Sequence, residues 1–197
     1  MTMSLILKPA PEHGRAIVAR AVRDLWSAGA GAGAAGGAAL NLSEPIPLYR
    51  LGLDQVSAEG VSGAEPVGWR YLLEAGSGSA AVADLGQRAG DEARFASLSR
   101  GDAARRLMDA AALAATIADG KPTPYEIRIL DVPALHVSAI WLSGKPDIFI
   151  PYLDIKRLRG GDVEVDDDFV RRLDARAKSM RDALTGMAPR PAAESGG

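Results

Sequence analysis

The feature that most constrains the fold is the apolar alternation in residues 125–152, YEIRILDVPALHVSAIWLSGKPDIFIPY. Tyr125, Ile127 and Ile129 alternate with polar residues, which predicts a strand with one apolar face. Pro133 lacks an amide donor and restricts the residue before it, so a break is expected between this strand and the next. The SGKPD segment further along is typical of a turn. Three consecutive antiparallel strands are therefore the simplest prediction for this region.

The middle strand of this region is expected to be central in its sheet. Its predicted faces carry Leu135, Val137, Ala139 and Trp141 on one side and His136, Ser138, Ile140 and Leu142 on the other. Apolar residues on both faces, near Ile140 and Leu142, imply that something covers each side of the strand.

The preceding residues predict a similar set of strands followed by a helix. Residues 45–53 favour a short extended segment, residues 67–85 a β-hairpin with a glycine loop, and residues 93–99 a further strand. Residues 101–120 are rich in alanine and predict a helix that Asp102 caps and Gly120 ends.

Amphipathic helices are expected near both ends of the chain. In residues 12–26 the apolar side chains fall on one stripe, and in residues 166–186 they recur at alternating spacings of three and four. The order of three strands and a helix then occurs twice, without a residue-level repeat. We therefore predict an α+β fold, with a mostly antiparallel sheet of about six strands, two or three helices packed on it and a βββα-βββα order.

Composition divides the chain into four segments. We expect an N-terminal helix in residues 1–27, a flexible Ala/Gly linker in 28–41, one α+β core with its C-terminal helix in 42–185, and a disordered tail in 186–197. The first helix is thus tethered, and it docks either on its own core or on a neighbouring copy.

Composition also excludes several classes of function. The chain has no cysteine, which rules out disulfides, thiolate metal sites and cysteine nucleophiles. A net charge of −2 gives no basic surplus for nucleic acid. The apolar run near the N-terminus is too short for a signal peptide, and no stretch approaches a membrane span. We expect a cytoplasmic protein, of bacterial type from its use of Ala, Gly and Arg.

Two short motifs match known patterns without the context that their chemistry requires. GAGAAG at residues 31–36 matches the glycine fingerprint of dinucleotide-binding folds, but a helix rather than a strand precedes it, which favours a linker. The acidic run in residues 162–168 offers carboxylates for a hard cation, but the valines between them favour an extended piece and a helix start. We predict no metal and no cofactor.

One candidate ligand site lies on the predicted sheet. His136 and Ser138 share one side of a strand, with their Cβ atoms about 7 Å apart. A serine nucleophile needs its base in direct contact, so no catalytic residue is assigned. Two interpretations of His136 stay open: it lines a pocket, or its role is structural. If a pocket exists, His136, Ser138 and Trp69 are its predicted ligand-binding residues.

The terminal helices suggest a second kind of site, a surface for a protein partner or for self-association. The residues predicted to bind the partner are Val18, Val22, Leu25, Leu173, Met180 and Leu184. Nucleophiles are few and no enzyme signature is present. The sequence therefore favours a non-enzymatic interaction module, such as a homo-oligomer, over a ligand-binding protein or an enzyme with a pocket near His136.

Overall fold

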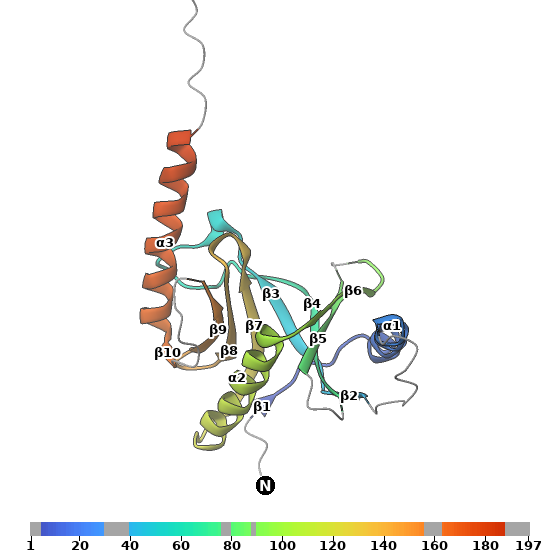
Figure 1. The fold of residues 1–197 in the computed structure, drawn as a ribbon. Coiled ribbons are helices and arrows are strands. Elements are labelled where there is room, and N and C mark those ends of the chain that lie inside the picture. Colours follow the sequence, from blue (N-terminus) through green and yellow to red (C-terminus); the bar gives the residue numbers. More distant parts are fainter. Residues whose placement is uncertain (1–4, 30–39, 76–79, 88–89, 156–162, 188–197) are drawn as a thin grey trace, which may run out of the picture.

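The structure is a computed structural model that describes residues 5–29, 40–75, 80–87, 90–155 and 163–187. Three α-helices and ten strands make up these residues (Figure 1). The helices are α1 (Gly14–Gly29), α2 (Asp102–Asp119) and α3 (Asp166–Met187). The strands are β1 (Leu5–Ile6), β2 (Leu40–Leu42), β3 (Ile46–Arg50), β4 (Glu65–Ala75), β5 (Ala80–Gly86), β6 (Arg94–Arg100), β7 (Tyr125–Val132), β8 (Val137–Ser143), β9 (Ile148–Asp154) and β10 (Glu164–Val165).

All ten strands belong to one sheet, in the order β10-β9-β8-β7-β3-β4-β5-β6, with β1 beside β7 and β2 beside β4. Neighbours are antiparallel except at the centre, where β3 and β7 run parallel, and at β1, which runs parallel to β7. Helix α2 contacts both β5 and β9, which are separated by four strands in this order. The sheet therefore curves around α2.

The helices cover both faces of the sheet. On the concave face, the apolar side chains of α2 pack against alternate residues of the central strands, such as Leu48, Ile129 and Ile140. On the other face, α3 packs over β7, β8 and β9, and α1 packs over β4 and β5. The central strands are thus buried on both sides, which accounts for the apolar residues on both faces of β8.

The predicted α+β class and mostly antiparallel sheet are confirmed. The strand count is larger than predicted, partly because β1, β2 and β10 have only two or three residues each. Segments this short carry no alternation that could be recognised in the sequence. The predicted break at Pro133 is a short 3-10 helix, Pro133–Leu135.

Two local predictions are wrong. Gly101, rather than Asp102, is the N-cap of α2, and Asp102 lies in the first helical turn. His136 is not part of β8: it caps the 3-10 helix in the left-handed conformation, with φ of 50°, and is exposed. The strand begins at Val137, so His136 and Ser138 do not share a strand face.

The segments at both ends are only partly described. Helix α1 continues to Gly29 and β2 begins at Leu40, so residues 30–39 of the predicted linker lie outside the described residues. Helix α3 continues to Met187, and the rest of the predicted tail lies outside them as well. No described helix is both long and apolar enough to cross a membrane.

Candidate functional site

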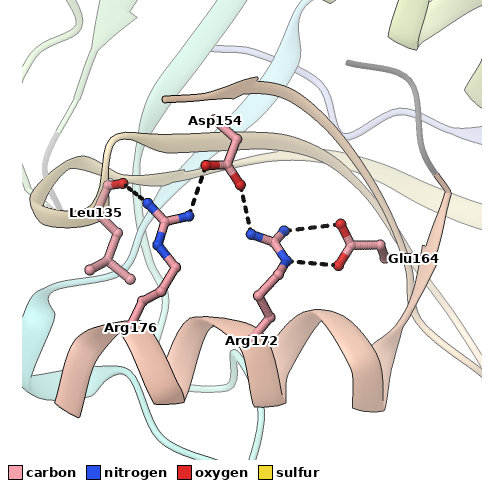
Figure 2. A network of polar contacts seen from close by, with 5 residues as sticks. All are labelled: Leu135, Asp154, Glu164, Arg172 and Arg176. Carbon is pink, nitrogen blue, oxygen red and sulfur yellow. Dashed lines mark hydrogen bonds and ion pairs between the residues drawn. The ribbon is translucent and has the colours of Figure 1, made fainter. Parts of the chain in front are cut away.

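The N-terminal half of α3 is fixed to the sheet by a polar network (Figure 2). Arg172 donates to both carboxylate oxygens of Glu164 at 3.0 Å and to Asp154 Oδ2 at 2.6 Å. Arg176 donates to Asp154 Oδ1 at 2.8 Å and to the carbonyl oxygen of Leu135. The Asp154 side chain is only 3% exposed, so this carboxylate joins two helical arginines in a setting that water screens poorly.

Aromatic packing holds the same half of α3. The Phe169 ring stacks on Phe149 with centroids 4.1 Å apart, and Phe149 stacks on Trp141. Val170 and Leu173 are also buried here. This half of the helix is therefore part of the core.

The C-terminal half of α3 projects beyond the sheet (Figure 1). The apolar stripe continues at spacings of three and four from Leu173 through Ala177 to Met180 and Leu184. Ala177 is fully buried, but Met180 is 37% and Leu184 54% exposed. The same face of the helix is thus covered at its start and open at its end.

Polar contacts also fix the beginning of the projecting half. Arg181 donates to the carbonyl oxygens of Leu53 at 2.7 Å and Val56 at 3.3 Å. Lys178 forms an ion pair with Asp174, one turn earlier, at 2.8 Å. The projecting turns therefore continue a helix that is held at several points, which favours a defined orientation for Met180 and Leu184.

The structure divides the residues predicted to bind a partner into covered and open ones. Val18 and Val22 are buried against β4 and β5, so α1 docks on its own core. Leu173 of α3 is likewise buried, against the sheet. Leu25 is 45% exposed, but α1 lies at the opposite end of the molecule from α3 (Figure 1). Of the predicted set, only Met180 and Leu184 form a shared open surface.

The three residues predicted to bind a ligand do not come together. His136 is exposed in the turn before β8. Ser138 is buried on the concave face, where its side chain bonds to Tyr152. Trp69 packs on the other face, with the cluster beneath α1.

Ser138 instead borders a buried polar cluster that the sequence did not reveal. Arg70 donates to Asp84 at 2.7 and 2.9 Å and to the Tyr152 hydroxyl at 2.7 Å, and lies 3.5 Å from Asp131. Burial raises the pKa of the Tyr152 hydroxyl, which keeps it neutral. These residues come from β4, β5, β7 and β9, so only the folded sheet unites them.

A weak signal for the α3 network is present in the sequence. Arg172 and Arg176 are four residues apart, and residues at this spacing share a helix face. Their partner Asp154 is distant along the chain, and Glu164 belongs to the acidic run of residues 162–168, which favoured an extended piece and a helix start. No pattern links these carboxylates to the arginines.

Comparison with known proteins finds no family model, curated protein or solved structure that matches this chain.

Proposed function

We propose that the chain is a non-enzymatic interaction module in which the projecting half of α3 pairs with the α3 of a second copy. The observation that carries this proposal is the continuous apolar stripe that passes from buried Leu173 and Ala177 to exposed Met180 and Leu184. A stripe with alternating spacings of three and four is the pattern by which helices pair in coiled coils.

A second copy is the favoured occupant because its α3 carries a matching stripe. Among the described helices, α2 buries its apolar residues in the core, and α1 buries Val18 and Val22. Two α3 helices related by a two-fold axis would each place Met180 and Leu184 against the other, because a two-fold interface is formed by the same patch on both subunits.

The expected association is weak. The ten residues from 178 to 187 extend about 15 Å, and two helices of this length bury less than the roughly 800 Å² per partner that is typical of stable complexes. We expect a dissociation constant on the order of 100 µM.

Sedimentation velocity of the full chain from about 5 µM to about 1 mM, a range that brackets this constant, tests the proposal. The sedimentation coefficient should rise with concentration toward that of a dimer. Leu184→Glu should abolish the rise, because it places two like charges in the apolar contact. Its matched control is Ser179→Glu, which adds the same charge to a different face of the helix and should still dimerise.

A chain that stays monomeric over this range contradicts self-association. So does a dimer that Leu184→Glu leaves intact, because its interface would lie elsewhere. Unchanged thermal unfolding of Leu184→Glu is expected, since this side chain is 54% exposed in one protomer.

A further inference from the structure

The concave face of the sheet, opposite α3, contains a cleft of about 530 Å³. We call it the Gly86 cleft, and its lining includes Leu48, Arg50, Val67, Gly86, Glu92 and Arg94. It lies at the end of the β4–β5 hairpin that carries Val67 and Gly86. Helix α2 approaches the other end of the same hairpin, near Leu72 and Ala80.

Gly86 lines this cleft, and its cross-strand partner in β4 is a second glycine, Gly68. The strand register aligns Leu48, Gly68, Gly86 and Arg94 in one row across β3, β4, β5 and β6. The two middle positions of the row therefore lack side chains.

The backbone requires glycine at only one of these two positions. At Gly68 the backbone requires glycine, because φ is +151° and an added Cβ would lie 2.0 Å from the Leu85 carbonyl oxygen. At Gly86 it does not: an added Cβ would meet nothing closer than the Ala96 Cβ at 3.7 Å. Gly86 is the last residue of β5. A strand glycine that the backbone does not require is often found where a ligand or another backbone approaches the sheet closely.

Four charged residues at the rim form no ion pair within the part of the chain that the structure describes. They are Arg50, Asp91, Glu92 and Arg94. Arg50 has two carboxylates beside it in register, Asp131 and Glu65. However, Asp131 lies by Arg70, and Glu65 accepts a hydrogen bond from Gln55.

The charge at the floor is already balanced. Asp84 accepts two hydrogen bonds from Arg70 and one from Ser97 at 3.1 Å. The open charges are therefore those of the rim. Arg50 supplies a positive charge at the β3 side, and Asp91 and Glu92 outnumber Arg94 at the β6 side.

We propose that the Gly86 cleft binds a small zwitterion of the size of an amino acid or dipeptide with an apolar side chain. Arg50 receives its carboxylate, Asp91 and Glu92 receive its ammonium group, and Leu48 and Val67 contact its apolar part. The charged ends of the cleft lie three strand spacings apart, about 14 Å between backbones, and long side chains shorten this gap from both sides. An extended dipeptide, up to about 7 Å long, suits the remaining distance.

The test is a titration of the ¹⁵N-labelled full chain with the dipeptide leucyl-leucine. The amide signals of Val67, Gly86 and Ala96 should shift with a dissociation constant of about 1 mM or below. N-acetyl-leucyl-leucine lacks the ammonium group and leucyl-leucinamide lacks the carboxylate. Each should bind at least about tenfold more weakly, because one charged contact is lost.

Two variants identify the site. Arg50→Gln should weaken leucyl-leucine at least about tenfold, and Gly86→Leu should abolish binding by filling the floor. The matched control is Arg106→Gln, which removes an exposed arginine of α2 outside the cleft and should bind normally. If Gly86→Leu does not fold, Arg50→Gln and the two analogues decide the outcome.

Absence of shifts at about 10 mM dipeptide, well above the expected constant, overturns the proposal. The proposal is also overturned if either analogue binds as tightly as leucyl-leucine, or if Arg50→Gln binds leucyl-leucine as tightly as the unmodified chain does. The result is independent of α3 pairing, because Leu184→Glu removes that interface and leaves the opposite face unchanged.

Discussion

Replacing Asp154 by alanine tests whether the network beneath α3 stabilises the fold. The variant removes the carboxylate that both Arg172 and Arg176 contact, at 2.6 and 2.8 Å. Removing one partner of a buried ion pair costs about 3–5 kcal/mol, because a buried charge loses its compensation. Arg172 keeps both bonds to Glu164, and Arg176 keeps the carbonyl of Leu135. The lower end, about 3 kcal/mol, is therefore expected.

The loss can be measured by urea denaturation followed through tryptophan fluorescence. One of the three tryptophans, Trp141, is 6% exposed and lies in the core beneath α3. For a chain of this size the same loss lowers the melting temperature by about 6–12 °C. The matched control is Asp168→Ala on the same helix. Its ion pair with Arg171 is equally short, 2.6 Å, but both side chains are more than 70% exposed.

The free energy of unfolding of Asp168→Ala should fall by about 0.5 kcal/mol or less, because water screens an exposed ion pair. Burial, not distance, is thus the variable under test. Equal losses in Asp154→Ala and Asp168→Ala would refute the reasoning, as would a loss below about 1 kcal/mol in Asp154→Ala. In the double variant Asp154→Ala/Arg176→Met the loss should be smaller than the sum of the single losses, because the two residues share one interaction.

Three further predictions concern the sheet. Gly68→Ala should lower the free energy of unfolding by more than about 3 kcal/mol in urea denaturation, because its Cβ would overlap the Leu85 carbonyl. Gly86→Ala should change the same free energy by less than about 1 kcal/mol. Similar losses in the two variants would contradict the backbone constraint assigned to Gly68. Arg70→Met should cost at least about 3 kcal/mol, because Asp84 and Asp131 lose their cation, and Arg70→Lys should lose less; a neutral Arg70→Met would show that the cluster does not stabilise the sheet. The hydrogen bonds from Arg128 hold the pKa of Glu126 below its ordinary value of 4.5, so Glu126 stabilises the fold above that pH and the effect is lost as the pH falls through the lowered value. Glu126→Gln should therefore cost about 1 kcal/mol at neutral pH and nothing in strong acid, and a cost that does not vary with pH would contradict this.

Much of the fold follows from periodicity alone. Alternation in residues 125–152 predicted β7, β8 and β9, and the apolar residues Ile140 and Leu142 predicted that β8 is covered on both faces. These predictions hold because the alternation of strand side chains is a local property. The pairing of strands depends on residues far apart in the chain, so alternation could not predict the parallel contact between β3 and β7.

The candidate sites were predicted less well, and for the same physical reason. The stripe with Met180 and Leu184 was identified, but spacing cannot tell where a helix leaves the sheet, so buried Leu173 was grouped with them. His136 matched the strand alternation, yet the chain turns there in a left-handed conformation before β8 begins. The isolated Gly86 carries no signal until the register places it beside Gly68.

The strand order explains why the two proposed sites lie on opposite faces. The sheet consists of two halves that meet at the parallel pair β3 and β7. In each half the strands follow one another outward in chain order, β7-β8-β9-β10 in one and β3-β4-β5-β6 in the other. Two such halves with parallel first strands are related by a half-turn about an axis along those strands, and a half-turn of this kind exchanges the faces of the sheet. The helix that follows each half therefore packs on a different face, α2 on the concave one and α3 on the other. Because the sheet separates α3 from the Gly86 cleft, a variant at either place should leave the other function intact.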